Sequence, residues 1–244
     1  METPQIDMTQ SQAVLDELLD DDRSVKERFT AHFGPELKEL SDRFAEAFLH
    51  LPTLYEAANK DGRVQAALVA AFAFCVLDDI LVSSKVLLTG KLMPAGNLMR
   101  QAVEGIAVVI MCACDGLLIV ETRKKSPTTA RYWKLLEAAD KRVHSHHALA
   151  QLEYNRLRLQ IAQANIDRLK AAKKHYNQFS HPNLLGFAAK VDLAKAGTVY
   201  AGGHFDDEKI EGYRIELRER IGLVGILPNL FDELAKQVGA YEQP

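Results

Sequence analysis

The residues most able to do chemistry lie in the stretch KKHYNQFSHPN, residues 173–183, where a proline must end any helix. If the helix continues almost to this proline, Asn177 and His181 share one face, and Lys174 lies one turn before Asn177. A histidine can take and give a proton near neutral pH, and a lysine can stabilise charge that develops on a phosphate. RNA cleavage by the strand's own 2′-hydroxyl needs these functions and no metal. The row therefore has the groups that such a catalytic site needs, and a polar helix end is the alternative interpretation.

A second group of polar residues interrupts the apolar stretch 94–114. Its members recur at spacings of three and four and form one narrow stripe on the predicted helix: Asn97, Arg100, Gln101 and Glu104. The preceding apolar stretch contains Asp78 and Asp79, whose charges are costly to bury unless they are paired. We expect this acidic pair to face the stripe. The contact would be either a buried ion-pair network that fixes helix register or the floor of a polar pocket.

A metal site is the weakest of the candidate sites. Asp140, His144 and His147 would share one helix face, a spacing that could hold a divalent metal. A solvated helix end is the simpler interpretation, because the Glu-x-x-His pairs of ferritin-like sites are absent. The phosphate-binding patterns GxxxxGK[ST] and GxGxxG are absent too, and Ser180-His181 lacks the flanking glycines of a hydrolase elbow. We expect neither a metal nor a cofactor.

Helices must supply the framework that positions these residues. Apolar periodicity, prolines, glycines and capping residues predict helices at 12–33, 35–50, 52–61, 63–89, 94–114, one or two from Ser126-Pro127 through 128–181 with a break near 144–147, and 207–238 with a kink at Pro228. Residues 186–193 and 198–201 could form a small β-hairpin or an ordered loop. The predicted fold class is all-α: an antiparallel up-and-down helical bundle with a small loop or β-hairpin insert before the last helix.

The chain is predicted to form one domain with three parts: a disordered N-terminus (1–12), N-terminal helices that pack on the bundle (13–62), and the bundle itself (63–244). The content of 26% charged and 48% hydrophobic residues is that of an ordinary soluble globular protein. An acidic cluster stands where a secretory signal needs a basic start, and the longest apolar run, 66–77, is too short to span a bilayer. We therefore expect a cytoplasmic protein with no membrane association.

The cysteines indicate the redox compartment of the protein, and the charge distribution indicates one class of ligand. Cys75, Cys112 and Cys114 lie in apolar runs and form no CxxC pair, which predicts buried thiols in a reducing compartment. The formal net charge of the chain is -3, yet residues 131–175 contain 10 basic and 4 acidic side chains and are net +6. Such a basic segment can recruit a polyanion, although a solvated helix face is the commoner meaning.

Three motifs together resemble the prokaryotic HEPN superfamily, in particular its divergent members of unknown function. The first is Arg-x-x-x-Glu on an apolar helix (Arg100 and Glu104), and the second is Asn-x-x-x-His before a helix break (Asn177 and His181). The third is a segment like Tyr-x-x-x-Ser-x-His-Pro at residues 176–182, followed by a short insert and a final helix. The resemblance covers roughly residues 64–238.

HEPN members with an arginine followed four to six residues later by a histidine are typically metal-independent ribonucleases. Their site is shared across a dimer, often in toxin-antitoxin or anti-phage systems. The resemblance implies that His181 is the motif histidine and that Asn177 is the polar residue that usually follows the arginine. Tyr176 stands at the place of the arginine itself, so Lys174 or His175 would have to replace it.

The resemblance thus implies a stress or defence protein that binds RNA or a nucleotide around His181. Supporting roles fall to Tyr176, Ser180, Arg100, Glu104, Asp78 and Asp79. Two alternatives stay open: a metal-independent endoribonuclease that acts as a toxin or anti-phage effector, and a non-catalytic structural or protein-interaction module. Expected partners are a second copy in a homodimer, which the nearly all-round apolar helices also favour, and a cognate antitoxin or regulatory protein.

Overall fold

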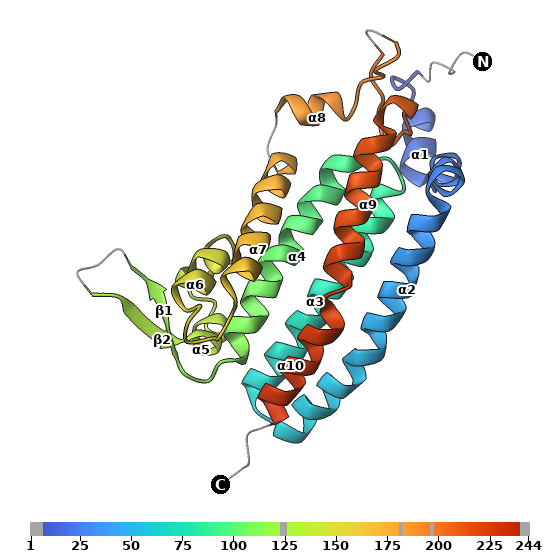
Figure 1. Cartoon of the computed structure of the whole chain (residues 1–244). Helices are drawn as coiled ribbons and strands as arrows, with labels where there is room; N and C mark the ends of the chain where they lie inside the picture. The colour runs from blue at the N-terminus through green and yellow to red at the C-terminus, as the bar shows by residue number, and fades with distance from the viewer. Residues whose placement is uncertain (1–6, 123–125, 181–182, 196–197, 240–244) are drawn as a thin grey trace.

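The computed structural model describes residues 7–122, 126–180, 183–195 and 198–239. Long helices form an elongated bundle (Figure 1): α2 (Arg23–Asp61), α3 (Val64–Leu87), α4 (Leu92–Ala113), α7 (Gln163–Tyr176), and α9 (Ile210–Val224) followed by α10 (Leu227–Gly239). The chain runs alternately up and down the bundle through α2, α3, α4, α7 and the α9–α10 pair. The predicted all-α, antiparallel up-and-down bundle is therefore confirmed.

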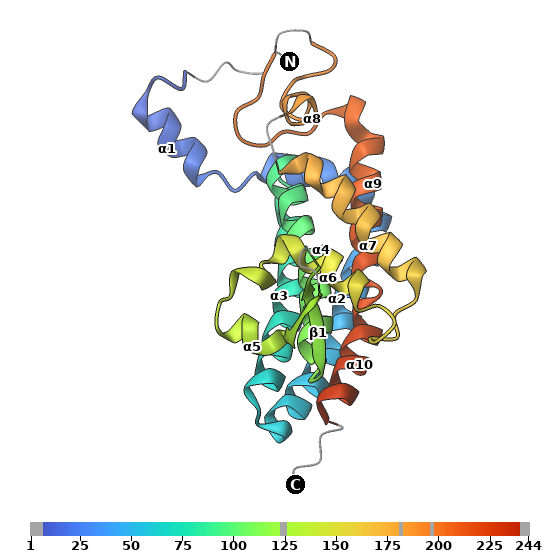
Figure 2. The ribbon, with the colours of Figure 1, turned by 90° about the vertical axis from the view of Figure 1, so that its left-hand side faces the viewer.

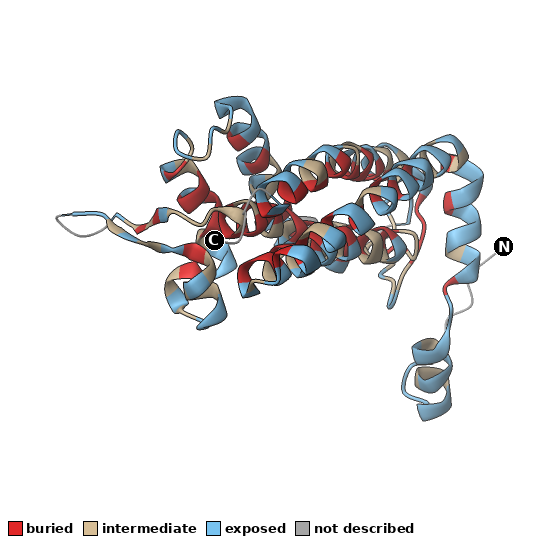
Figure 3. Cartoon of the chain, turned by 90° about the horizontal axis from the view of Figure 1, so that it is seen from below, coloured by how far each residue is buried: buried red, intermediate tan, exposed pale blue. Residues whose placement is uncertain are grey.

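The core lies along the contacts between these helices. Seen from below, the buried residues face one another inside the bundle and the exposed ones line its outside (Figure 3). α3 and α4 pack closely, since a side chain at Gly105 would lie 2.8 Å from Val76 Cγ2. These two helices were predicted to within three residues at each end. Gly90, with a φ of 74°, ends the turn after α3.

The N-terminal helices differ from their predicted boundaries. The predicted helix 12–33 is broken after the short α1 (Ser11–Leu19), where Asp22 has a φ of 53°. From there α2 continues through both prolines that were predicted to end helices, Pro35 and Pro52. Only a kink at Phe33 marks the first of them, because the buried aromatic face of α2 stays packed on the bundle across it.

α3 packs mainly against α4 and α2, and one of its faces is exposed. Among the described residues it is the helix long and apolar enough to cross a membrane, with a mean hydropathy of 2.1 over its most apolar window. Core helices of soluble proteins meet the same criteria. Of its residues, Cys75 was predicted to be buried and is exposed, whereas Cys112 on α4 is buried as predicted.

The predicted long helices over residues 128–181 are wrong. In their place are a hairpin of β1 (Leu117–Glu121) and β2 (Thr128–Arg131), then α5 (Tyr132–Glu137), two 3₁₀ turns, α6 (Ala148–Tyr154) and α7. Figure 2 shows β1, α6 and α7 in front of α4. The side chain of Asn155 pairs with both backbone groups of Ile119, at 2.8 and 2.9 Å, and thereby replaces a third strand. This side-chain pairing stabilises a hairpin that local periodicity does not reveal.

The predicted insert before the last helices is present as a loop. It contains the short α8 (Leu184–Ala188) and an isolated bridge between Val191 and Val199. The predicted kink in the last helix is a complete break between α9 and α10. Pro228 lies in the first turn of α10, where its missing N–H costs no helical hydrogen bond.

Candidate functional site

The end of α7 and the 3₁₀ helix η3 (Asn177–Phe179) carry four of the predicted site residues: Lys174, His175, Tyr176 and Asn177. His181, the predicted acid or base, lies outside the described residues. The other predicted side chains divide by their surroundings. Those that contact the bundle are His175, Tyr176 and Ser180, and those exposed to solvent are Lys174 and Asn177. The predicted row is therefore a boundary between a buried polar network and an open surface.

A buried carboxylate holds His175. Its Nε2 lies 2.8 Å from Oε1 of Glu216 on α9, and the His175 side chain is 41% exposed while Glu216 is buried. The hydrogen bond to Glu216 raises the pKa of His175, and burial opposes this rise. Burial alone would raise the pKa of Glu216, but the hydrogen bond from His175 and the charge of Arg220 lower it. The pair therefore favours a protonated imidazole beside an ionised carboxylate.

Arg220 connects this pair to the core of the bundle. It is completely buried, and its Nη1 donates to Glu216 Oε2 at 2.8 Å and to the Glu216 carbonyl at 2.7 Å. Nη2 donates to Ser83 Oγ on α3 at 2.8 Å, and Ser83 donates in turn to the Ala95 carbonyl on α4 at 2.7 Å. One polar network thus runs from the surface at α7 through α9 to α3 and α4.

The polar stripe of α4 meets α7 rather than α3. Glu104 is buried, and its Oε1 lies 2.9 Å from Lys173 Nζ and 3.9 Å from Arg100 Nε. Two turns before Glu104 on α4, Asn97 Oδ1 accepts a hydrogen bond from Ser180 Oγ at 3.1 Å. The structure therefore brings together the predicted Arg100, Glu104 and Ser180, and adds Lys173.

The predicted contact between this stripe and the acidic pair on α3 is wrong. Asp78 is exposed, and Asp79 has no cationic partner among the described residues. Burial, together with the nearby charge of Asp78, raises the pKa of Asp79 to about 6. Residue spacing defines the face of a helix but not the direction in which that face turns, and here α3 turns Asp78 to solvent.

Sequence reasoning missed the residues that anchor His175. Glu216 and Arg220 are four residues apart on α9, and both lie among positions that continue its buried apolar face, such as Leu217 and Val224. The sequence did contain a signal for these residues, because charged side chains stand at positions of the helix where the periodicity predicts apolar ones. Nothing in the spacing of the sequence could pair Glu216 with a residue of α7.

The hairpin and α5–α7 form a basic lobe, defined as residues 117–122 and 126–176, on one side of the bundle (Figures 1 and 2). Four basic side chains of the lobe pair with carboxylates: Arg131, Arg142, Lys170 and Lys173. The others have no acidic partner within the described part of the chain: Lys134, Lys141, Arg156, Arg158, Arg168 and Lys174. The lobe therefore presents a surplus of positive charge to solvent.

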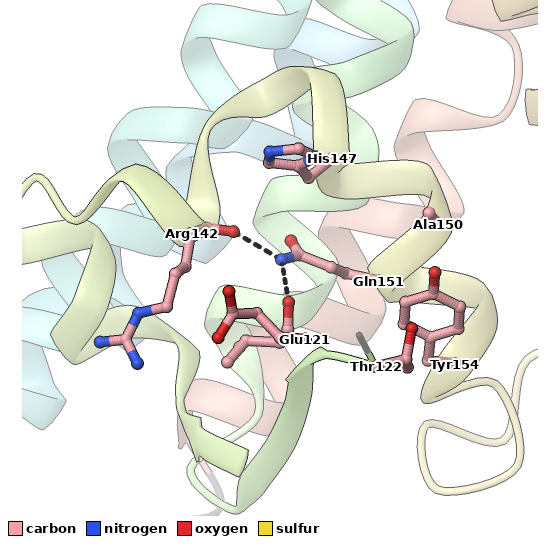
Figure 4. A pocket seen from close by; sticks show the side chains of 8 residues that line it. Glu121, Thr122, Arg142, His147, Ala150, Gln151 and Tyr154 are labelled. Atoms are coloured by element: carbon pink, nitrogen blue, oxygen red, sulfur yellow. Dashed lines mark hydrogen bonds between the residues drawn. The ribbon is translucent and has the colours of Figure 1, made fainter. Parts of the chain in front are cut away.

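A pocket of about 140 Å³ opens on this lobe between the end of β1 and α6 (Figure 4). Its walls are formed by Val120, Glu121, Thr122, Arg142, His147, Ala150, Gln151 and Tyr154. Gln151 reaches across it and donates both amide protons, to the Val120 carbonyl at 2.9 Å and to the Arg142 carbonyl at 2.6 Å. Its Oε1 is left buried with no hydrogen-bond partner among the described residues.

The predicted metal candidates lie in this lobe but do not converge. The segment around Asp140, His144 and His147 forms short 3₁₀ turns instead of one helix face. Asp140 binds Arg142 through two hydrogen bonds of 2.9 and 2.6 Å, which lower its pKa to about 2. In the described ranges no group of three His, Cys, Asp or Glu residues is placed to hold a metal ion.

Comparisons of the chain with protein-family models, with curated proteins and with solved structures gave no match. The likeness to HEPN proteins therefore depends on the sequence motifs, and the geometry of the site is argued from the chain alone.

Proposed function

We propose that this protein binds single-stranded RNA or a nucleotide through the basic lobe and the adjoining end of α7. The observation that supports this most is the gathering on one lobe of six basic side chains that have no acidic partner in the described ranges, next to an imidazole held in place by Glu216. Basic side chains of such a surface would displace the counterions that condense on a phosphate chain, and this release dominates the affinity for nucleic acids. The proposed setting is a cytoplasmic prokaryotic protein of the stress or defence type.

Binding of a labelled single-stranded RNA, followed by fluorescence anisotropy over a range of salt concentrations, tests this function. We expect the variant Lys174→Gln to bind more weakly and to reduce the slope of log K against log salt by about 0.7, the value for one phosphate contact on a single strand. Lys38→Gln is the matched control, because Lys38 is an exposed lysine on α2, away from the lobe. Equal affinity and equal slope for all three proteins would refute the proposal.

RNA cleavage is the second candidate function, and it is supported by the contact between His175 and Glu216. A carboxylate that orients an imidazole and raises its pKa prepares it to donate a proton to a leaving group. In this proposal His175 takes the place of the missing motif arginine, and His181 supplies the second proton transfer. Incubation of RNA with wild type, His175→Gln and His181→Ala, in the presence of a chelator, tests cleavage. Loss of cleavage in both variants with RNA binding retained is expected, and equal cleavage by all three proteins would exclude these roles.

The non-catalytic alternative gives a different result in the same experiment. If His175 only holds α7 on α9, the wild type neither binds nor cleaves RNA, and a loss of stability is the whole effect of His175→Gln. A cognate antitoxin or other regulatory protein remains a predicted partner.

A further inference from the structure

The pocket on the basic lobe contains a hydrogen-bond acceptor that no donor reaches. Gln151 is 2% exposed, and its Oε1 has no partner among the described residues because both amide protons already bind carbonyl groups. A buried oxygen without a donor is costly, so the site is complete only when a donor enters. The volume of about 140 Å³ is roughly ten times what one water needs. It is smaller than the range of about 300–1,000 Å³ typical for drug-sized ligands, so it suits a group the size of a single ring.

The walls of the pocket match the edge and face of a nucleobase. Tyr154, 44% exposed, offers an aromatic ring at the rim with Thr122 beside it, and Glu121 adds a carboxylate across from them (Figure 4). Bases in single-stranded RNA are recognised by stacking on aromatic side chains and by hydrogen bonds at their edges. We propose that the pocket beside Gln151 receives one unstacked base of the bound strand or nucleotide, whose N–H group donates to Gln151 Oε1. This inference rests on the proposed RNA binding.

The acceptors in the pocket predict which bases enter it. Adenine, cytosine and guanine carry an exocyclic amino group with two N–H donors, whereas uracil offers only a ring N–H. One additional hydrogen bond changes affinity by between about two- and ten-fold. Short homopolymeric strands of cytidine should therefore bind more tightly than those of uridine by about this factor.

Ala150→Trp is the best variant for the test, because Ala150 is an exposed wall residue of α6 whose enlargement fills the pocket without breaking the bonds of Gln151. Ala171→Trp, at an exposed alanine of α7 outside the pocket, is the matched control. We expect Ala150→Trp to abolish the preference for cytidine over uridine and Ala171→Trp to keep it. Tyr154→Ala should weaken binding of both strands about five-fold or more through lost stacking.

The results distinguish the proposed RNA binding from the proposed base pocket. If wild type binds neither strand at low salt, the proposed function fails. If it binds both equally, and Ala150→Trp changes nothing, RNA binding stands and the base pocket is refuted, since water alone then fills the site. Titration with cytidine monophosphate, followed by NMR, separates the sources of the base. Binding of the monophosphate that Ala150→Trp removes supports a nucleotide ligand, and binding of the strand alone supports RNA.

Discussion

Replacing Arg220 with methionine tests whether charge holds the buried network together. The variant keeps a long side chain but leaves Glu216 buried, with His175 as its remaining partner. Removing one member of a buried ion pair costs about 3–5 kcal/mol, because the other charge is no longer compensated. Since 1 kcal/mol shifts the melting temperature by about 2–4 °C for a chain of this size, we expect Arg220→Met to melt about 6–20 °C below wild type.

The double variant Glu216→Leu/Arg220→Met separates the charge from the packing. Both charges are then absent, and apolar groups of similar length fill the space between α9 and α3. Replacing a buried ion pair with apolar side chains is often neutral in stability. We expect the double variant to recover at least about 2 kcal/mol relative to the sum of the two single variants.

Urea unfolding followed by circular dichroism measures the free energies of unfolding of these variants. The pH dependence of the same free energies is a second test. Without Arg220, burial should raise the pKa of Glu216 above its unfolded value. The stability linked to such a group is present at low pH and is lost as the pH rises through its folded pKa. The cost of Arg220→Met should therefore be smaller at about pH 5 than at about pH 8. A cost below about 1 kcal/mol, or a double variant as unstable as the sum of the singles, would refute the reasoning.

Three further predictions concern single residues on α7, α3 and α4. His175→Gln removes an imidazole whose pKa is raised by its buried carboxylate partner, so the two proteins should differ in stability most below about pH 6.5 and converge as the pH rises through the folded pKa; an NMR titration and urea unfolding check both parts. Asp79→Asn should stabilise the protein by about 1–3 kcal/mol at neutral pH and much less below pH 3.8, because burial raises the pKa of Asp79 to about 6; thermal melts at two pH values measure this. Gly96→Ala should cost about 1–3 kcal/mol, since the new Cβ would lie 2.3 Å from the ring of Phe179, whereas Gly222→Ala meets nothing within 4 Å and should cost nothing.

The parts of the fold that were predictable are those whose signals are local. α3 and α4 could be bounded because apolar runs meet a capping glycine and a proline at their ends. Residues 128–181 contain neither glycine nor proline, yet the chain breaks there at Ala139 and Gln160, which have positive φ angles of 51° and 54°. Alanine and glutamine are not residues whose presence predicts a positive φ or a helix break. Long-range pairing between Asn155 and β1 decides the local structure instead.

The site was predictable only in part for a related reason. The stretch at the end of α7 was singled out by its polar residues, but its partners lie 41 residues away in the case of Glu216 and 69 in the case of Glu104. Helical spacing can show that Glu104 and Arg100 share a face of α4. It cannot show that Lys173, from α7, completes the cluster.

Lys173 and Lys174 are neighbours on α7, but the helix directs their side chains into different surroundings and so gives them different roles. Lys173 binds Glu104 on α4 and His175 binds Glu216 on α9, so side chains two residues apart, about 200° around the helix, hold α7 from opposite sides. Lys174 lies between them and turns to solvent. Neutralising Lys173 should therefore destabilise the fold by leaving a buried carboxylate unpaired, while neutralising Lys174 should change only what the surface binds. A polyanion can thus reach α7 without disturbing the contacts that hold the helix.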